Sequence, residues 1–427
     1  MSILIAGAGI GGLTTALSLH AAGVGDVRVL ESVAEIKPLG VGLNILPNAV
    51  RELAELDLLD ELLEVALPTG SLGYYNRHGQ LIWREPRGVA AGYRWPQLSV
   101  HRGRLQSVLA DTVRRRLGPD AIVTDARVEG FVPREDGGVD VRVHHTAAGR
   151  RSETTADALI GADGIHSKVR ACLYPEEGPP PWNGLVVWRG TTYAPPFLDG
   201  RSMIIAGDDR RRAVVYPMSG PDGPGGTVLM NWAVARAADP EAVFEDADWN
   251  RAVAPETFLH HFADLAFDWL DVPALIRTAR EAYVYPMVDR DPLPRWTHGA
   301  VTLLGDAAHA MYPMGSNGAT QSIVDARVLA RELALGDSPV PALAAYEAER
   351  LPVLTRIQAS ARRRGPEVVI DLAHERAPGG FTDVGAVFPG DELQSISAEF
   401  ARLGGFDPET VNTRASLTVP SRAGGPR

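Results

Sequence analysis

The sequence contains a single cysteine, Cys172, and only two lysines, Lys37 and Lys168, among its 427 residues. One cysteine excludes an intramolecular disulfide and any metal site built from several thiolates. We expect Cys172 to have a packing role, because no catalytic-cysteine signature surrounds it. Arginine therefore carries nearly all of the positive charge, a bias that we attribute to genome composition rather than to mechanism.

Long apolar runs and an excess of positive charge are also missing. The formal net charge is −11, which offers no basic surface to nucleic acid or anionic lipid, so neither partner is expected. No apolar run approaches the roughly 18 residues of a membrane span. No signal peptide precedes the first expected strand at residues 2–6, and we therefore expect a cytoplasmic protein.

The chain has the composition of a globular protein and begins with a βαβ pattern. Hydrophobic residues make up 45% and charged residues 22% of the sequence, and a chain of this length favours two intergrown domains. An apolar strand at residues 2–6 stops at glycine, a helix is expected over 11–22, and a second strand over 27–30 ends on Glu31.

Further along, segments with helical spacing of apolar residues are followed by segments with strand-like alternation. A run of strands without intervening helices predicts a separate antiparallel sheet, with a hairpin loop at 219–226. The end of the chain, 418–427, is expected to be disordered. The expected helices lie at 48–63, 102–117, 319–335, 342–364 and 392–402, and the expected strands at 139–143, 156–160, 185–193, 201–206, 213–218, 227–234 and 300–304.

Between the first strand and the first helix lies the turn Gly7-Ala8-Gly9-Ile10-Gly11-Gly12. In a dinucleotide-binding turn, Gly7 permits the tight bend, Gly9 admits a pyrophosphate and Gly12 allows close helix–strand packing, while the helix N-terminus attracts the anion. Glu31 then has the position of a carboxylate that hydrogen-bonds the adenosine ribose, which argues against a 2′-phosphate. A purely structural glycine turn is the alternative, and this pattern alone does not separate FAD from NAD.

Two later segments resemble motifs of the flavoprotein aromatic hydroxylase family, which includes 4-hydroxybenzoate and salicylate hydroxylases. Asp163-Gly164, within residues 159–170, resembles its Asp-Gly motif, and Gly305-Asp306, within residues 303–313, resembles its Gly-Asp motif. The resemblance covers residues 1–370 and implies FAD, with Asp306 on the flavin ribitol chain. It also implies an α/β fold with a Rossmann-like domain of the glutathione-reductase type, an inserted antiparallel substrate sheet and C-terminal helices.

The resemblance divides the chain into alternating parts. We expect the FAD-binding domain at 1–75, 101–180 and 291–373, the last part including a long helix. The substrate domain is expected at 76–100 and 181–290. Residues 374–427 are expected to form a C-terminal tail beyond the region of resemblance, partly disordered, whose role in oligomerisation or closure stays open. The protein is expected to be a monomer or a homodimer.

The chemistry of the Gly-Asp segment can also be argued from its residues. A strand that ends at Asp306 places a carboxylate at the sheet edge where open α/β sheets bind ligands. Pro313 and Gly315 shape the following loop, and a helix then begins at Asn317-Gly318-Ala319. Its N-terminus would face an isoalloxazine ring and stabilise negative charge on the reduced flavin. The alternative is an ordinary strand–loop–helix junction.

Several further residues are carried over from the family as cofactor contacts. Gly42 lies in the segment that runs beside the flavin, and the Val128 main chain matches a position near the adenine. Arg104 matches an arginine near the pyrophosphate, with Arg102 as the competing candidate and a salt bridge at a helix start as the structural alternative. His309 and Pro313 are expected near the flavin. We expect His309 to be structural rather than a general base, and no metal site is expected.

The family resemblance implies a reaction in which NADH or NADPH reduces FAD and the reduced flavin reacts with O2. A flavin C4a-hydroperoxide then hydroxylates an electron-rich ring, so no catalytic residue is assigned. No second glycine motif follows a strand, and the nicotinamide is therefore expected to bind transiently. Five stretches resemble a branch of phenazine-modifying monooxygenases that is also similar to salicylate-type hydroxylases: 83–88, 99–103, 188–190, 199–204 and 285–294.

The substrate is expected to be a small aromatic molecule held by the inserted sheet, although residues of these types are more often plain core. Other oxidative chemistry in secondary metabolism stays open, namely N-oxidation, Baeyer–Villiger oxidation or dehydrogenation. A non-enzymatic scaffold that keeps the FAD fold is less favoured, because it would not need the ribitol and ribose contacts. The candidate substrate residues are Trp188, Tyr216, Met218, Asn231, Trp232, Met287 and Pro313.

Overall fold

The structure, a computed structural model, describes residues 1–238 and 251–419. Its nucleotide-binding part is built on a five-stranded parallel sheet with the strand order β21-β12-β1-β2-β8. All four residues of β1 are buried, as expected for a parallel strand covered on both faces. The strands of this sheet are β1 (Ile3–Ala6), β2 (Val27–Leu30), β8 (Ile122–Val123), β12 (Ala158–Gly161) and β21 (Val301–Leu303).

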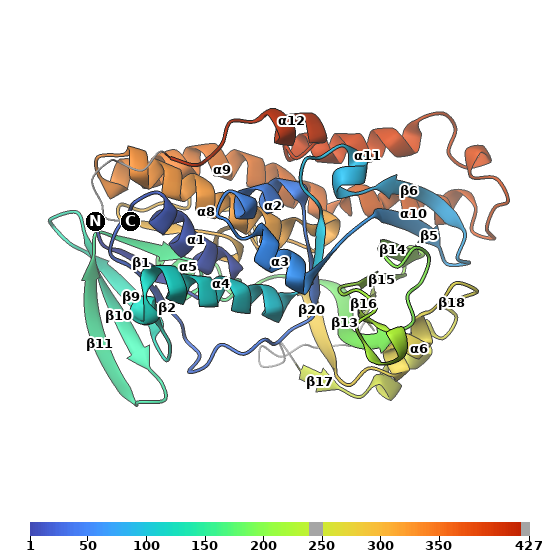
Figure 1. Cartoon of the computed structure of the whole chain (residues 1–427), viewed down its shortest axis with the longest axis horizontal. Helices are drawn as coiled ribbons and strands as arrows, with labels where there is room; N and C mark the ends of the chain where they lie inside the picture. Colours follow the sequence, from blue (N-terminus) through green and yellow to red (C-terminus); the bar gives the residue numbers. More distant parts are fainter. Residues whose placement is uncertain (239–250, 420–427) are drawn as a thin grey trace.

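Helices cover one face of this sheet, and a small antiparallel sheet accompanies the other side. Helix α1 (Ile10–Ala21) packs against both α4 (Arg102–Leu117) and α8 (Asn317–Leu335), and α9 (Pro339–Arg362) packs on α8. Figure 1 shows α8 and α9 side by side above the parallel sheet. The antiparallel sheet consists of β9 (Arg127–Pro133), β10 (Val139–His145) and β11 (Arg150–Ala156).

The second large unit is an eight-stranded sheet in the order β17-β20-β13-β16-β15-β14-β5-β6. Its neighbours run antiparallel except for the parallel pair β14 and β5. Figure 1 shows it beside the nucleotide-binding part. Its strands are β5 (Ser71–Asn76), β6 (Leu81–Pro86), β13 (Trp182–Ala194), β14 (Ser202–Gly207), β15 (Arg211–Pro217), β16 (Val228–Ala237), β17 (Arg251–Val253) and β20 (Ala282–Val288).

Two hydrophobic clusters cover the opposite faces of this eight-stranded sheet. One contains Trp232, Phe258 and Phe262 and packs beneath the 3-10 helix η6 (Leu259–Phe262) and α6 (Val272–Arg277). The other brings Tyr74 and Met203 together with Ile370 and Phe388 from the C-terminal part of the chain. The mixed α/β fold with a largely antiparallel inserted sheet confirms the expected fold class.

The order of elements departs from the predicted order in two places. A single helix was predicted over 48–63, but the structure has α2 (Pro47–Ala54) and α3 (Leu59–Val65). Asp57 between them has a φ of 55°, a left-handed conformation that interrupts the helix and that Asp tolerates better than most residues. The single strand predicted at 156–160 covers the last residue of β11 and most of β12, and these two strands belong to different sheets.

The C-terminal part is helical in the described residues, with α10 (Val368–Arg376), α11 (Glu392–Leu403) and α12 (Pro408–Thr413). Residues 420–427 of the predicted disordered end lie outside the described residues, whereas Thr418 accepts a hydrogen bond of 2.8 Å from Arg327. No helix in the described ranges is long and apolar enough to cross a membrane.

The remaining elements are short. They are the strands β3 (Gly42–Ile45), β4 (Ala66–Pro68), β7 (Leu98–His101), β18 (Ala266–Phe267) and β19 (Leu270–Asp271), the helices α5 (Lys168–Leu173) and α7 (Asp306–His309), and the 3-10 helices η1 (Gly88–Ala91), η2 (Pro119–Ala121), η3 (Pro224–Gly226), η5 (Pro255–Thr257), η7 (Met314–Ser316), η8 (Gly365–Glu367) and η9 (Val384–Ala386).

Candidate active site

The N-terminal glycine turn shows why its first and last glycines are required. Gly7 has a φ of 101° and a Cβ there would lie 2.5 Å from the carbonyl oxygen of Ala162. A Cβ on Gly12 would lie 2.0 Å from the carbonyl oxygen of Gly7, so α1 could not approach β1 as closely. A Cβ on Gly9 would meet no atom within 4 Å. Gly9 is therefore free of packing constraints and faces open space, as a pyrophosphate contact requires.

Glu31 ties the end of β2 to this turn. Its carboxylate accepts hydrogen bonds from the backbone N–H groups of Ala8, at 2.7 Å, and Val33, at 2.9 Å. On the other side, Nε2 of Gln106 donates to the Ala8 carbonyl at 2.8 Å, a contact that the sequence did not indicate. The turn is thus held from β2 and from α4. The contact of Glu31 with a ribose stays a prediction.

The Gly-Asp segment places an unpaired carboxylate beside a helix N-terminus. Asp306 is exposed, and its carboxylate has no hydrogen-bond partner among the described residues. Helix α8 begins after Ser316, which provides no side-chain cap, so its first N–H groups have no intrahelical acceptor. Gly318 and Ala319, in that first turn, line the same cavity as Asp306. A carboxylate for hydroxyl groups and N–H donors for carbonyl oxygens therefore face one space.

That space is a cavity of about 820 Å³ between the nucleotide-binding part and the eight-stranded sheet. Gly9, Ile10 and Gly11 line it at one side, and Asp306 with the first turn of α8 lines it further along. Pro313 and Gly315 lie in the same wall. The open space at Gly9, the unpaired Asp306 and the uncapped helix fit the pyrophosphate, ribitol and isoalloxazine of FAD in that order. The residues present therefore fit this cofactor.

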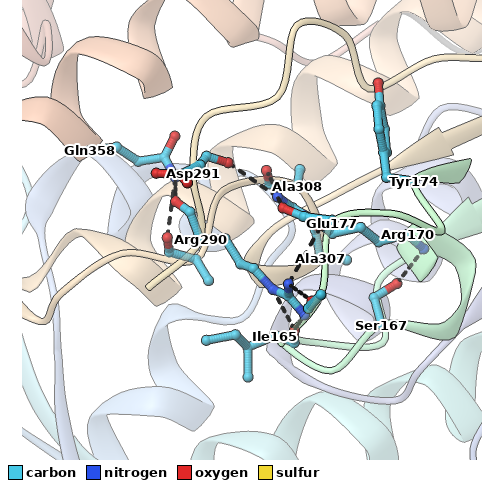
Figure 2. A network of polar contacts seen from close by, with 12 residues as sticks. Ile165, Ser167, Arg170, Tyr174, Glu177, Arg290, Asp291, Ala307, Ala308 and Gln358 are labelled. Atoms are coloured by element: carbon cyan, nitrogen blue, oxygen red, sulfur yellow. Dashed lines mark hydrogen bonds and ion pairs between the residues drawn. The ribbon is translucent and has the colours of Figure 1, made fainter. Parts of the chain in front are cut away.

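Two buried arginines join the Asp-Gly segment to the Gly-Asp segment (Figure 2). Nη1 of Arg170 donates to the carbonyl oxygens of Ala307 and Ala308 at 3.0 Å each. Arg290 donates to the carbonyl of Ile165 at 3.3 Å, and Ile165 lines the cavity. These bonds fix the spacing between the two motifs, which lie more than a hundred residues apart in sequence.

The carboxylate of Asp163 stabilises its own turn rather than facing the cavity. It accepts hydrogen bonds from the Ser167 hydroxyl at 2.5 Å and from the backbone N–H of Lys168 at 2.7 Å. Burial raises the pKa of Asp163, although these bonds oppose the effect. Its neighbours Gly164 and Ile165 line the cavity. It is therefore the turn after Asp163, and not the Asp163 carboxylate, that lines the cavity.

His309 belongs to a buried polar chain beneath the flavin-side wall. Its side chain is fully buried, and Nε2 lies 2.6 Å from Oδ2 of Asp325. Asp325 also accepts from Arg350 at 2.7 Å, and Arg350 donates to Gln321 at 2.7 Å. Gln321 then donates to Asn317 at 3.0 Å. The chain links His309 to the first residue of α8, consistent with the structural role expected for it.

The remaining cofactor candidates differ in whether they line the cavity. Arg102 lines the cavity, whereas Arg104 is not among the lining residues. Arg104 instead lies near His101, whose pKa is lowered by burial and then by this arginine. Val128 is buried in β9 opposite Val143, away from the cavity. The assignments of Arg104 and Val128 stay predictions.

Gly42 approaches the eight-stranded sheet closely. A Cβ on Gly42 would lie 2.6 Å from the Asn231 Cβ and 2.6 Å from the Met218 sulfur. Oδ1 of Asn231 accepts from the Gly42 N–H at 2.8 Å, and Arg189 donates to the Gly42 carbonyl at 2.9 Å. The segment expected beside the flavin is therefore held by the substrate sheet itself.

One face of this sheet forms the substrate side of the cavity. Because side chains alternate along a strand, Asn231 in β16 faces the cavity while Trp232 faces away. Tyr216 and Met287 also line the cavity, and so does Pro313 opposite them. Burial raises the pKa of the Tyr216 hydroxyl, which therefore stays a neutral hydrogen-bonding group.

The structure brings neither of the two candidate tryptophans to the cavity, and their contact with a substrate stays a prediction. Trp188 stacks on Phe258 with ring centroids 5.1 Å apart. Trp232 is fully buried and its Nε1 donates to Thr192 at 3.1 Å. Both belong to the cluster on the far face of the sheet. Met218 lies under Gly42 and is also not among the lining residues.

Sequence reasoning missed the side chains next to those tryptophans. Arg189 follows Trp188 and faces the cavity, with its Nε unpartnered among the described residues. Tyr285 lines the same side, and burial raises its pKa. Phe400 in α11 also lines the cavity, and it packs so closely on Gly315 that a Cβ on this glycine would lie 2.4 Å from the phenyl ring. Strand alternation could have indicated Arg189, but no local pattern indicates Phe400.

Comparisons with known proteins agree with this geometry. The profile of a family described as FAD binding domain matches residues 1–361. The chain belongs to this FAD-binding family. Phenazine 1,6-dicarboxylic acid hydroxylase PhzS from Lysobacter antibioticus is 47% identical over 366 residues, 85% of this chain and 89% of that protein. Aurachin C monooxygenase/isomerase from Stigmatella aurantiaca is 32% identical over 359 residues, 82% of this chain and 85% of that protein.

Solved structures share the fold. The structure of Klebsiella pneumoniae HpxO complexed with FAD and uric acid has a TM-score of 0.73 at 24% identity and covers 96% of each chain. A salicylate hydroxylase substrate complex has a TM-score of 0.73 at 23% identity and covers 99% of each chain. The expected family and the expected FAD are confirmed. The chain is an FAD-dependent aromatic monooxygenase.

Proposed function

We propose that this monooxygenase hydroxylates a phenazine carboxylate or a closely related planar heteroaromatic acid. The observation that carries the proposal is the identity of 47% with a phenazine 1,6-dicarboxylic acid hydroxylase over 85% of the chain. The cavity supports it, because an extended sheet face with Arg189 and Tyr216 lies opposite the loop of Pro313. A flat aromatic acid placed there has apolar walls for its ring and a cation for its acid group.

The side chains present would position and shield the reaction rather than carry it. FAD, when bound, supplies the redox chemistry that activates O2. Asp306 would bind the ribitol chain, and the N–H groups of Gly318 and Ala319 would stabilise negative charge on the ring. Asn231 and Arg189 fix the backbone of Gly42, in the segment that would run beside the ring. Phe400 excludes water from the loop at Gly315, which favours coupled turnover over release of H2O2.

The remaining features of the reaction are part of the same proposal. NADH or NADPH is the reductant. It binds only transiently, since no second Gly-x-Gly-x-x-Gly motif follows a strand in the sequence. The protein acts as a monomer or homodimer in the cytoplasm, where that reductant is available. His309 is not the base, because its Nε2 is engaged by Asp325.

The test is a substrate screen with purified holoenzyme. Phenazine-1-carboxylate, phenazine-1,6-dicarboxylate, salicylate and 3-hydroxybenzoate are each supplied with NADH or NADPH. We expect phenazine acids to stimulate NAD(P)H oxidation and O2 uptake in equal amounts, with 18O from 18O2 in the product. Stimulation by the benzoates alone would overturn the phenazine assignment while leaving the aromatic monooxygenase in place.

A second candidate follows from the relative named aurachin C monooxygenase/isomerase. Its 32% identity over 82% of this chain supports an oxygenation that is coupled to an isomerisation of the substrate. Mass spectrometry and NMR of the labelled product distinguish the two candidates, since a simple hydroxylation keeps the ring skeleton of the substrate and an isomerisation rearranges it.

A further inference from the structure

The cavity extends along the substrate sheet far beyond the flavin side. Tyr216 lines it near Gly42, and Arg212, four residues earlier in β15, lines its other end. Four residues of a strand span roughly 13 Å at about 3.3 Å per residue. The far end is therefore separate from the position of oxygen transfer, although it opens into the same space.

This far end contains an acid without a partner. Glu367 is 7% exposed and lines the cavity at the end of η8. Its carboxyl group forms no hydrogen bond or ion pair with any described residue. A buried ionised carboxylate without a partner is costly, and such a group instead keeps its proton or meets a ligand. Residue 367 also lies beyond the matched family region, which ends at residue 361.

The groups around Glu367 come from four elements. Arg212 in β15 and Arg364 both pair with Asp371 in α10, and Nη1 of Arg212 is buried with no partner among the described residues. Tyr74 in β5 is fully buried and donates a long hydrogen bond of 3.5 Å to Glu85 in β6. A separate ion pair joins His374 on α10 to Asp209, which lines the cavity, at 3.3 Å. One carboxylate thus serves two guanidinium groups, which leaves positive charge beside Glu367.

The charge of the whole lining points the same way. Among the residues that the structure describes, seven arginines and four carboxylates line the cavity, whereas the chain as a whole carries a net charge of −11. One of the four carboxylates, Asp306, lies on the side of the cavity that would hold the cofactor. The substrate side is therefore a cationic surface inside an acidic protein, which concentrates anionic ligands.

We propose that Glu367 and Arg212 form a subsite for a carboxylate at the end of the substrate distant from the ring position that is oxygenated. Glu367 in its protonated form donates a hydrogen bond to this carboxylate, and Arg212 neutralises its charge. The inference rests on the proposed function and deepens it, because it makes Glu367 a specificity-determining residue that selects dicarboxylates over monocarboxylates. An amine at this end is disfavoured by Arg212 and Arg364, and a neutral hydroxyl would leave their charge uncompensated.

Burial raises the pKa of Glu367 to about 7, against the opposing effects of Arg212 and Arg364. Glu367 therefore holds its proton below about pH 7 and is an anion above it. Protonated Glu367 donates to a ligand carboxylate, whereas ionised Glu367 repels it. Affinity for a dicarboxylate should then be highest near pH 6 and fall as the pH rises through 7. Gln at this position keeps a donor but has no such titration.

The experiment measures ligand binding to the non-reduced holoenzyme through the change in flavin absorbance, without turnover. The probes are phenazine-1,6-dicarboxylate, phenazine-1-carboxylate and the matching naphthalene di- and monocarboxylates. The variants are Glu367→Gln, Glu367→Ala and the control Glu375→Gln, which makes the same change on the exposed side of α10. Flavin content and Tm of each variant report its folding.

We expect Glu367→Ala to weaken dicarboxylate binding about tenfold, with little change for the monocarboxylate. The wild-type Kd for the dicarboxylate should rise at least fivefold from pH 6 to pH 8, and the Glu367→Gln profile should be flat. Because this variant keeps His374 and the same ligand, a slope that persists in it belongs to those groups and overturns the assignment to Glu367. Equal affinities of wild type for mono- and dicarboxylates would also overturn the subsite.

Failure of the proposed function gives a different pattern. If the phenazines do not bind but the naphthalene dicarboxylate binds in a Glu367-dependent manner, the subsite stands and the phenazine assignment falls. If phenazine acids bind without a preference for the second carboxylate, the phenazine assignment stands and the subsite falls. If no probe binds to a folded, flavin-loaded protein, both fall.

Discussion

The imidazole Nε2 of His309 lies 2.6 Å from Oδ2 of Asp325, with both side chains fully buried. The same carboxylate accepts from Arg350 at 2.7 Å. Burial acts to raise the pKa of Asp325, but His309 and Arg350 hold it below its ordinary value. The stability that Asp325 contributes is therefore present above the unfolded-state pKa and is lost as the pH falls through the folded-state pKa.

Removal of either partner should weaken the wall behind the flavin rather than the chemistry. We expect His309→Ala and Asp325→Asn to lower the free energy of unfolding by about 3–5 kcal/mol, because each leaves a buried polar partner unpaired. FAD retention should fall together with the stability, since the chain of hydrogen bonds from His309 and Asp325 leads through Arg350 and Gln321 to Asn317. Urea unfolding and flavin content measure these effects, with His144→Ala, which breaks a partly exposed pair, as control. Unchanged stability with abolished turnover would instead assign catalysis to His309.

Two glycines of the N-terminal turn should respond differently to the same change. Gly12→Ala forces a Cβ to within 2.0 Å of the Gly7 carbonyl oxygen, so we expect loss of thermal stability in the apoprotein. Gly9→Ala meets no protein atom within 4 Å, so the apoprotein should keep its Tm. That variant should bind FAD much more weakly, because its Cβ enters the space of the pyrophosphate. Equal FAD affinity of Gly9→Ala and wild type would contradict the placement of the cofactor.

Mutations on the two faces of the substrate sheet should have different effects. Trp232→Ala should cost about 3–5 kcal/mol of stability by leaving a cavity in the far cluster, while the remaining folded enzyme keeps its substrate preference. Tyr216→Phe removes only a hydroxyl that faces the cavity, and it should raise KM or H2O2 release with little change in Tm. Steady-state kinetics with peroxide detection test both variants. A change of substrate preference in Trp232→Ala would put this face in doubt.

Arg170 should be far more costly to replace than a surface arginine. Arg170→Gln removes the guanidinium donors to Ala307 and Ala308 and leaves Glu177 with only the longer ion pair to Arg290, at 3.5 Å, so we expect a loss of about 3–5 kcal/mol and weaker FAD binding. Arg115→Gln breaks an exposed pair with Glu61, and its effect should not exceed about 1 kcal/mol. Chemical unfolding of both variants provides the comparison. Similar losses in the two would contradict the role of Arg170 between the motifs.

The parts of the site that the sequence predicted are those encoded in short contiguous segments. Gly7 to Gly12 and Gly305-Asp306 each carry a strand end, a turn and a helix start within a few residues, so local rules indicate where a ligand lies. Those rules also predicted the large sheet, because strands 185–193 and 213–218 alternate clearly. The helix predicted over 48–63 failed because Asp57 adopts a positive φ that composition does not reveal.

The differences between the predicted substrate wall and the lining of the cavity have a physical origin in strand geometry. Asn231 and Trp232 are adjacent in one strand, so a regular strand cannot direct both at the same cavity. Choosing candidates by aromatic character selected Trp188 and Trp232, whereas the alternation anchored at Tyr216 selects Arg189 and Asn231. Glu367 and Phe400 could not be found in this way, because only tertiary packing brings the last third of the chain over the sheet.

Phe400 against Gly315 has a consequence for biosynthesis. The cavity begins at Gly9, near the start of the chain, and is completed by a ring nearly four hundred residues later. Strand β1 likewise waits for β12 before it has a neighbour on that side. Such long-range pairings form slowly, and the ribosome synthesises Phe400 after every other residue of the cavity named above. A chain that lacks Phe400 can therefore hold FAD only in a site that is open at Gly315.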